Sequence, residues 1–572
     1  MELSLSQKAG LVFHILRWRL TWSRRNTGYF PPDLDNPKFM SALSAVSLIN
    51  DGDTVLSCGM AANARCSIFY YALKERFLEK QSPTGLTWVG VGAMGSRGRV
   101  PGTIEELDFP EIIDRYIGGH LETMKAQLRL AEEGHIELHS MPQGVMADLF
   151  ELQAQKKYSV VTDVGVGTFL DPRIGAGTCV VPGVGESLVR AEGDDLCYTM
   201  PPINAAMFVA SYADREGNIY VNNAATLTEN LGAARAAKAN NGKVLVSVYD
   251  IIDKKESEIF LNADMVDAVV VNPYSEQTGS VPMKRYWPLF TVSAKEDQEL
   301  SITRLKYVNE LLKITPIRRA PELAMARLAG LIFTEVAGKG SEVNIGVGLP
   351  EEVCRLVREG GLEEDVNFGT ETGVWGGLPA PGIFFGAAVN PEKMMSSHEI
   401  FKFWEDNLDV TILGLLEADS EGNINVSKRG EGPINYVGPG GLPNLVNSAK
   451  KIIFIGTWMA NARFRIDDGK LVIEEPGPHK FKEEVDQITF SGRRALEKGK
   501  KVYYVTNVGA FRLTERGMEL SHIMPGLDVE KDIIGPCPMK IVLPESGGPR
   551  VVDRSVVTGE GFQLKWPETP VL

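Results

Sequence analysis

A single acidic residue, Glu371, stands among small and uncharged neighbours in a pattern that suits covalent chemistry. It lies between Thr370 and Thr372, and Gly373 follows. No charge cluster and no oppositely charged partner at helical spacing accompanies it. Because glycine lets a substrate carbonyl approach closely, a carboxylate placed here can act as a nucleophile. The alternative is a glutamate that caps a loop at the end of a strand, and this stretch alone favours neither.

Two further glycine-bearing loops can present backbone N–H groups to an oxygen or a phosphate. One spans residues 163–173 and includes Gly165 and Gly167; the other spans residues 435–443 and includes Gly440 and Gly441. Either loop alone is explained by a tight turn. Their occurrence together, in a chain that also holds Glu371 and an internal repeat, favours a ligand site.

Residues 90–95 fit the pattern G-x-G-x-x-G, but the sequence that follows cannot begin a helix. A dinucleotide site needs a helix N-terminus at that point to hold the pyrophosphate, so a nicotinamide or flavin cofactor is disfavoured. Arg97 and Arg99 in this loop could contact a phosphate, although a solvated turn is the favoured interpretation.

His135 and His139 lie in a segment with a strand pattern, which places them roughly 13 Å apart. That separation is too large for one metal ion, so we predict no metal site. No H-E-x-x-H, P-loop or G-x-S-x-G motif occurs, so the commonest classes of hydrolase and NTPase are excluded.

Composition restricts the class of protein. A chain of 572 residues with 44% hydrophobic residues is expected to form two to four globular domains. Its formal charge of -14 disfavours nucleic acid or an anionic membrane as the main partner. The six cysteines include no C-x-x-C pair, and no signal peptide or long apolar run is seen. We therefore expect a cytoplasmic protein.

Residues 8–25 are apolar and basic and contain no acid. Such a segment can form an amphipathic helix on a membrane or a partner, or act as an organelle address. The favoured interpretation is a terminal helix that packs against the body or a neighbouring subunit, and membrane contact is the less favoured one.

The chain repeats itself: residues 213–221 and 418–426 match at seven of nine positions. Each copy predicts a turn between strands, with Gly-Asn supplying positive φ. In each half, ahead of the repeated segment, a helical segment leads into a strand that ends in glycine, at 39–59 and at 323–348. After the repeated segment comes a buried strand, at 244–248 in the first half and at 452–455 in the second. Further helices are expected at 122–133, 227–239 and 350–359.

This alternation predicts an α/β chain of two tandem, related, open α/β domains with mainly parallel sheets. The expected division is an N-terminal extension at 1–38, a first domain at 39–271, a linker at 272–316 and a second domain at 317–572. Glycine loops at the carboxyl ends of the strands would then meet in an active site at the interface.

Taken together, these segments resemble the family I CoA-transferases, and within them the single-chain acetate/propionate branch. The resemblance covers most of the chain beyond the N-terminal extension. The matching segments are residues 142–144, 165–173, 344–350, 371–373, 385–391, 421–427 and 438–441.

The resemblance implies that Glu371 is the nucleophile of a ping-pong transfer of CoA from a short-chain acyl-CoA to a carboxylate. A glutamyl anhydride and a glutamyl-CoA thioester would be the intermediates, with no ATP, no metal and no tightly bound cofactor. CoA would be substrate and product, and the enzyme a homo-oligomer. The residues expected at the oxyanion or CoA-binding positions are Gly440, Gly441, Asn425, Gln143, Gly165, Gly167 and Asn390.

Two departures leave the acyl group open. The loop at 57–64 lacks the Gly-Phe and Pro usual in propionate enzymes, and residues 1–38 extend beyond the common plan. Two alternatives also stay open: an acyl-CoA hydrolase on the same fold, and a non-catalytic CoA-sensing scaffold.

Overall fold

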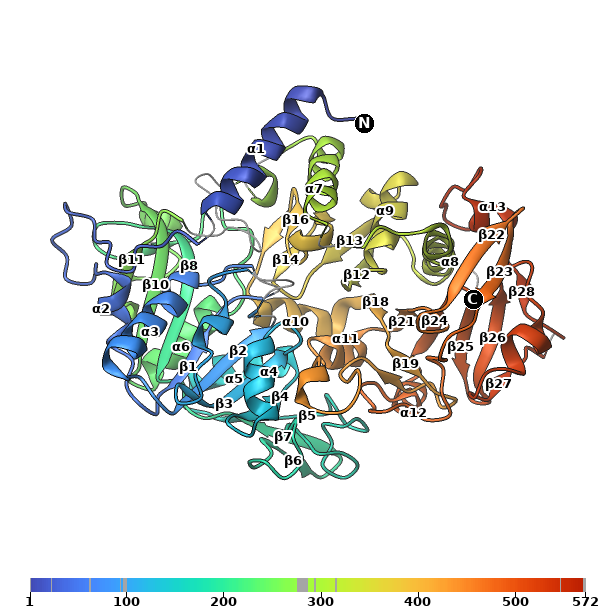
Figure 1. Ribbon diagram of the computed structural model, residues 1–572, viewed down its shortest axis with the longest axis horizontal. Coiled ribbons are helices and arrows are strands. Elements are labelled where there is room, and N and C mark those ends of the chain that lie inside the picture. The colour runs from blue at the N-terminus through green and yellow to red at the C-terminus, as the bar shows by residue number, and fades with distance from the viewer. Residues whose placement is uncertain are drawn as a thin grey trace.

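Two mainly parallel sheets, one from each half of the chain, lie side by side with helices packed around them (Figure 1). The computed structural model describes residues 2–21, 23–60, 63–92, 94–95, 100–274, 287–292, 295–313, 316–545 and 547–568. The expected α/β class is confirmed.

The first sheet has the strand order β11-β10-β8-β1-β2-β3-β4, with every neighbouring pair parallel and β9 antiparallel to β8. Its residues alternate between two apolar clusters: Phe208 of β8 packs in one and Met207 in the other. The sheet is therefore buried on both faces, as parallel sheets usually are. Its strands are β1 (Thr54–Ser57), β2 (Leu86–Gly92), β3 (Ile113–His120), β4 (Glu137–Ser140), β8 (Ala205–Ala213), β9 (Ile219–Tyr220), β10 (Lys243–Ile251) and β11 (Ala268–Val271).

The second sheet has the order β17-β14-β13-β12-β18-β21-β24-β25-β26-β27, and β28 also pairs with β26. The strands from β13 to β24 are parallel, whereas β14, β17 and the hairpin of β25 and β26 are antiparallel additions. Its strands are β12 (Ser341–Ile345), β13 (Val366–Gly369), β14 (Val374–Trp375), β17 (Lys393–Met394), β18 (Leu408–Gly414), β21 (Lys451–Ile455), β24 (Lys501–Val505), β25 (Gly509–Thr514), β26 (Gly517–Ile523), β27 (Ile541–Val542) and β28 (Arg550–Val551).

The remaining elements are helices that flank the sheets and four small antiparallel groups. The groups are β5 (Ser159–Thr162), β7 (Asp195–Thr199) and β6 (Val189–Glu192); β15 (Leu378–Pro379) and β16 (Ala388–Val389); β19 (Glu417–Ala418) and β20 (Ile424–Asn425); and β22 (Arg463–Asp467) and β23 (Lys470–Glu475). The helices are α1 (Leu5–Thr21), α2 (Ala42–Val46), α3 (Ser67–Lys80), α4 (Lys125–Glu132), α5 (Gln143–Gln153), α6 (Asn230–Ala239), α7 (Gln298–Leu312), α8 (Ala320–Val336), α9 (Glu351–Glu359), α10 (Ser397–Asn407), α11 (Leu442–Ser448), α12 (Gly492–Glu497) and α13 (Arg554–Thr558). The helices expected at 122–133, 227–239 and 350–359 correspond to α4, α6 and α9.

The internal repeat is visible in three dimensions. In the first sheet β1 lies between β8 and β2, and in the second β12 lies between β18 and β13. The repeated segment forms the turn from β8 to β9 in one half and from β19 to β20 in the other. Each half thus places equivalent strands at the centre of its sheet.

The repeated turn is held by an aspartate and an asparagine. Asp214 accepts bonds from the backbone N–H groups of Glu216 and Asn218 and from the Asn218 side chain (2.8 Å), and Asp419 and Asn423 repeat the pair (3.0 Å). Only the glycine of each copy has positive φ, at 93° and 77°. The expectation that the asparagine of each copy also has positive φ is wrong. Its side chain instead donates a hydrogen bond to the aspartate of the same turn.

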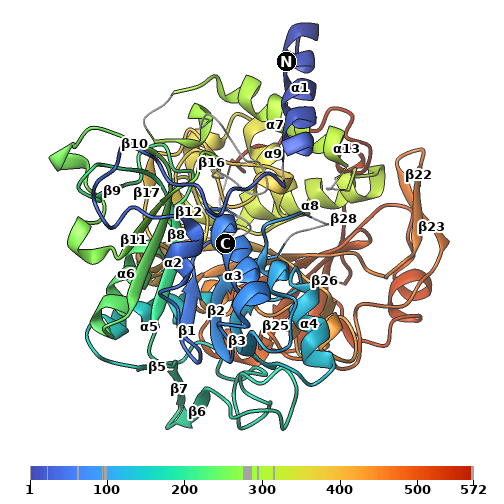
Figure 2. The same cartoon turned by 60° about the vertical axis from the view of Figure 1, so that its left-hand side comes forward.

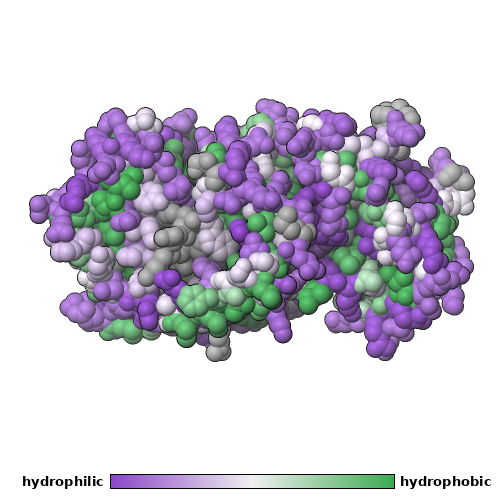
Figure 3. Space-filling view, turned by 90° about the horizontal axis from the view of Figure 1, so that it is seen from above, coloured by the Kyte–Doolittle hydropathy of each residue, from purple (hydrophilic) through white to green (hydrophobic). Residues whose placement is uncertain are grey.

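Helix α1 packs on α7 and projects from the top of the molecule, as Figures 1 and 2 show. Trp18 is buried, and the His14 ring lies 5.4 Å from the Trp287 ring, which confirms the expected packing against the body. On another face Phe13 and Leu20 are exposed. Viewed from above, hydrophobic residues form separate patches on a mostly hydrophilic surface (Figure 3). None of the described helices is long and apolar enough to span a bilayer.

Candidate active site

Glu371 occupies a tight turn at the carboxyl end of β13, in the second sheet. The Gly373 N–H donates to the Thr370 carbonyl (3.0 Å), and the chain returns antiparallel as β14. Gly373 has φ of 97°, and a Cβ there would lie 1.9 Å from the Met395 carbonyl oxygen. A side chain at position 373 would therefore break the turn that presents the carboxylate.

The Glu371 carboxyl is partly buried and is held by a neutral donor. Loss of water raises its pKa above the ordinary value; hydrogen bonding by its own backbone N–H opposes this rise, and so does the Asn344 amide on β12. Asn344 is buried, and its Oδ1 accepts from the Thr411 hydroxyl of β18 (3.0 Å). Asn344 lies in the matching segment 344–350, but nothing in the sequence indicated a role for this residue.

The Gly441 backbone lies close to this carboxylate, at a position where a side chain would be crowded. A Cβ at that position would lie 3.1 Å from Gln143 Oε1, 3.2 Å from Glu371 Cγ and 3.3 Å from Phe401 Cζ. The structure therefore brings together three of the residues expected at the site, Glu371, Gln143 and Gly441. Phe401, on α10, was not among the predicted site residues. An aromatic residue on a helix usually belongs to the hydrophobic core, so nothing in the sequence pointed to a place in the site.

Gly440 and Gly441, in the loop of residues 435–443, differ in whether their backbone N–H is already hydrogen-bonded. The Gly440 N–H already donates to the Gly119 carbonyl of the first half (2.9 Å), and the Gly440 carbonyl accepts from the Gln143 N–H (3.1 Å). Among the residues that the structure describes, the Gly441 N–H has no acceptor. Of the two N–H groups, that of Gly441 is the one available to bind an oxyanion.

Asn425 and Asn390 are committed to other bonds. The Asn425 amide donates to Glu417 (2.8 Å) and to the Lys428 carbonyl (2.8 Å), and its oxygen accepts from the Ser427 and Lys428 N–H groups. The Ser427 carbonyl in turn accepts from the Gly438 N–H (3.2 Å), so Asn425 shapes the base of the glycine loop.

The Asn390 amide exchanges two bonds with the backbone of Glu296, at 2.7 and 2.9 Å. It therefore fastens the segment that connects the two halves.

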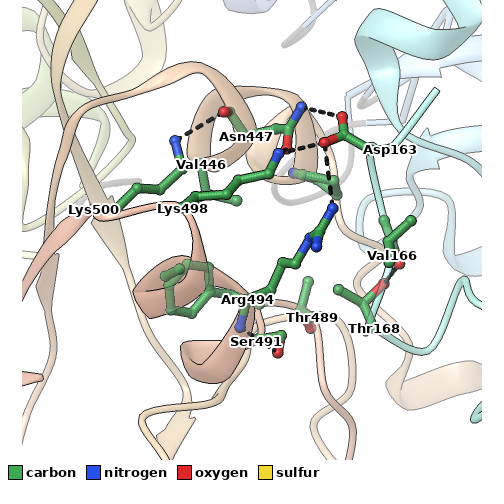
Figure 4. A pocket seen from close by; sticks show the side chains of 14 residues that line it. Asp163, Val166, Thr168, Val446, Asn447, Thr489, Ser491, Arg494, Lys498 and Lys500 are labelled. Atoms are coloured by element: carbon green, nitrogen blue, oxygen red, sulfur yellow. Dashed lines mark hydrogen bonds and ion pairs between the residues drawn. The ribbon is translucent and has the colours of Figure 1, made fainter. Parts of the chain in front are cut away.

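Gly165 and Gly167 line or border a pocket between the two halves (Figure 4). Both have positive φ, at 91° and 77°, and a Cβ on Gly167 would lie 3.4 Å from Ser491 Oγ. Helix α11 forms another wall of this pocket. Because α11 begins just after Gly441, a rise of 1.5 Å per residue puts its pocket-lining Asn447 roughly 9 Å further along the helix.

A second acid, Glu229, is buried where the two halves meet. It accepts bonds from the Gly59 N–H (3.3 Å) and from the Ser397 hydroxyl of α10 (3.2 Å), and burial raises its pKa to about 7. Its neighbour Thr228 donates its N–H to the Thr372 carbonyl (3.2 Å). The first half thus supports the turn that carries the candidate nucleophile.

Sequence reasoning also missed Glu229. The polar residues Thr228, Glu229 and Asn230 at the start of α6 were the available signal, but helix N-termini commonly carry such residues.

Other sequence expectations fall elsewhere. The strand expected around His139 is β4, where the buried His139 ring bonds to Glu137 (2.6 Å) and Thr178 (3.0 Å). No group of three or more His, Cys, Asp or Glu residues within the described part of the chain could hold a metal ion. Arg97, Arg99 and residues 61–62 of the first glycine loop lie outside the described residues.

Comparison with known proteins identifies the family. Residues 39–272 match the family model described as coenzyme A transferase. Caffeate CoA-transferase of Acetobacterium woodii is 33% identical over 512 residues, which cover 87% of this chain and 93% of that protein. The chain belongs to the coenzyme A transferase family. Acetate CoA-transferase YdiF of Escherichia coli K12 is 31% identical over 510 residues, or 86% of this CoA-transferase and 91% of YdiF.

Solved structures confirm the fold of this CoA-transferase. The apoenzyme of the acyl-CoA transferase YdiF from Escherichia coli O157:H7 superposes with a TM-score of 0.79 at 26% identity, covering 95% of this chain and 99% of that one. A thioester complex of the same protein with CoA superposes equally well, at 27% identity and covering 94% and 99%.

The Asn344 bond predicts a shift in the pH profile. Asn344→Ala removes a donor that favours the ionised Glu371, so the pKa of Glu371 should rise further above 4.5. We expect the acid limb of the kcat/KM profile to move to higher pH. Asn367→Ala is the control, because Asn367 on the adjacent strand bonds to Glu342 instead. An unmoved acid limb in Asn344→Ala would contradict the assigned contact.

Glu229 predicts a pH-dependent stability difference. Its pKa of about 7 in the folded protein exceeds the ordinary 4.5, so its contribution is present below about pH 4.5 and is lost as pH rises to about 7, up to about 3 kcal/mol. The Tm of the wild type minus that of Glu229→Gln should therefore decrease between about pH 5 and pH 8. The exposed Glu256→Gln serves as control. A difference in Tm that stays constant with pH would refute the burial argument.

Proposed function

We propose that this CoA-transferase moves CoA from an acyl-CoA to a carboxylate acceptor in a ping-pong reaction with Glu371 as the nucleophile. The observation that carries the proposal is the partly buried Glu371 carboxyl, which the backbone of Gly441 and the Gln143 side chain approach closely. A carboxylate that has lost part of its water and faces no cation is more reactive toward a carbonyl carbon than a solvated one.

In the first half-reaction a Glu371 oxygen attacks the thioester carbonyl carbon, and the C–S bond breaks to release the CoA thiolate. The product is an acyl-glutamyl anhydride. The thiolate then attacks the Glu371 carbonyl carbon, which expels the donor carboxylate and leaves a glutamyl-CoA thioester.

In the second half-reaction the acceptor carboxylate attacks that thioester and the same steps run in reverse. No group is oxidised or reduced, and the energy of one thioester is kept in another.

Each attack creates an oxyanion that needs a donor. The Gly441 N–H, next to Glu371 and at the start of α11, is the candidate, with the Gln143 amide beside it. A donor aimed at developing charge in a partly dry site lowers the barrier more than it stabilises the substrate. Asn425 contributes by positioning the loop rather than by touching substrate.

The substrates proposed are short-chain acyl-CoA thioesters, such as acetyl- and propionyl-CoA, with a simple carboxylate as acceptor. Caffeate and acetate in the names of two relatives show that the family spans aromatic and aliphatic acids. CoA enters as substrate and leaves as product. We also propose that the enzyme is a homo-oligomer. We propose further that residues 272–316 link two domains of the chain.

Replacement of the nucleophile should abolish transfer. Glu371→Gln keeps the size of the side chain but removes the attacking oxygen, so kcat should fall by roughly three orders of magnitude or more. Glu364→Gln, at an exposed position, is the matched control. In addition, borohydride should inactivate the wild type only after incubation with acyl-CoA and should modify Glu371. Undiminished transfer by Glu371→Gln would leave the non-catalytic scaffold as the better account.

Dependence on an acceptor separates transfer from hydrolysis. When no carboxylate is added, a transferase should release the donor carboxylate only in the amount of enzyme present and no net free thiol, because the CoA stays bound to Glu371. It should form a new acyl-CoA once an acceptor is supplied. The measurement is thiol release with and without acetate, with product thioesters separated by chromatography. Sustained turnover without any acceptor would instead favour the acyl-CoA hydrolase.

A further inference from the structure

Helix α1, which projects from the top of the molecule, presents an apolar face to solvent (Figures 1 and 2). Its body-facing side carries Trp18, which is buried, and Leu11, which is half-buried against the apolar core of the second half. On the opposite side Phe13, Leu16 and Leu20 are 69%, 55% and 79% exposed. Three large apolar side chains gathered on one exposed stripe of a helix are typical of an interaction surface.

The spacing of the exposed residues indicates what kind of partner this face fits. The α1 stripe consists of Ser6, Ala9, Phe13, Leu16 and Leu20, all of them exposed. Successive members are separated by three, four, three and four residues, so the pattern repeats every seven residues. This is the spacing of the a and d positions of a coiled coil, where each side chain fits between residues of a facing helix. The partner expected on the α1 stripe is therefore another α-helix.

The charges beside the α1 stripe favour a second copy of the same chain. Arg17 and Arg19 are exposed at its C-terminal end, whereas residues 2–12 hold the exposed Glu2 and no exposed cation. An antiparallel pair of α1 helices separates the arginines of the two copies and places each basic end beside the acidic end of the other. The chain has a formal charge of -14, so a second copy attracts these arginines, whereas an anionic bilayer would repel the rest of the protein.

We propose that two copies of the chain associate through an antiparallel, two-fold symmetric pair of α1 helices. In such a pair a and d positions face each other. Phe13 then packs on Leu16 of the partner subunit, and Leu20 packs on Ala9 of the partner subunit, so that a large side chain lies opposite a small one. The inference gives the proposed homo-oligomer one of its contacts, and it does not depend on the transfer reaction.

Sedimentation equilibrium of the full-length enzyme tests this contact. Leu16→Arg places a cation in the α1 stripe, and a two-fold contact contains the substitution twice, so self-association through α1 should weaken roughly 100-fold. Leu78→Arg is the matched control, because Leu78 lies on α3, outside the stripe, and is 56% exposed. Both variants should keep the transfer activity of the wild type, since neither residue belongs to the candidate active site.

Disulfide formation tests the antiparallel arrangement. Ala9→Cys and Leu20→Cys are prepared as two separate proteins, and each is oxidised alone and in a mixture of the two. An antiparallel pair should give cross-linked dimers only in the mixture, because position 9 of one copy faces position 20 of the other. The wild type under the same oxidant gives the background from its own cysteines, of which Cys179 and Cys537 are half-buried. Cross-linking of either variant alone above that background would show a parallel pair and overturn the proposal.

A Leu16→Arg variant that associates as strongly as Leu78→Arg would also overturn it. If the wild type then still exceeded the mass of a monomer, the homo-oligomer would stand on another surface. Flotation with anionic phosphatidylserine vesicles that is kept by Leu78→Arg and lost by Leu16→Arg, at unchanged mass, would assign the α1 stripe to a membrane instead. The transfer reaction is tested separately by Glu371→Gln.

Discussion

The structure depends on keeping one carboxylate partly out of water and bonded to neutral groups. Hydrogen bonding by its own backbone and by the Asn344 amide opposes the rise in the pKa of Glu371, and no positive charge of the described residues contributes to that pKa. A buried carboxylate of this kind is costly, and only a rigid setting retains it. The turn at Gly373, the Thr411 bond to Asn344 and the support of Thr372 by Thr228 supply that setting. A cation would lower the cost but would also reduce the reactivity of the carboxylate.

This setting is assembled from both halves of the chain. The glycine loop of the second half bonds through Gly440 to Gly119 and to the Gln143 N–H, and Asn444 of α11 accepts from the Gly144 N–H (3.1 Å). These contacts use backbone groups more than side chains, so they fix the distance between the halves closely. They explain why two loops separated by about half of the sequence can serve one reactive centre.

The sequence predicted the fold well because the parallel strands are continuous apolar runs and the repeated turn is nearly identical in both halves. It also predicted that Glu371, Gln143 and Gly441 belong to one site, since their segments carry the family resemblance, and the structure places the three close together. It could not distinguish the N–H of Gly440 from that of Gly441, because the difference lies in the Gly119 carbonyl, which is remote in sequence. Glu229 was missed for a related reason: its partners, Gly59 and Ser397, come from two segments remote from it in sequence.

The contribution of both halves to the centre has a consequence for the isolated parts. A polypeptide holding only the second half would keep Glu371 on its turn but would lack Gln143, the Gly119 carbonyl and the Thr228 support. Such a fragment would contain the proposed nucleophile without the groups of the first half that surround it. The proposed reaction therefore requires both halves of the chain to fold against each other.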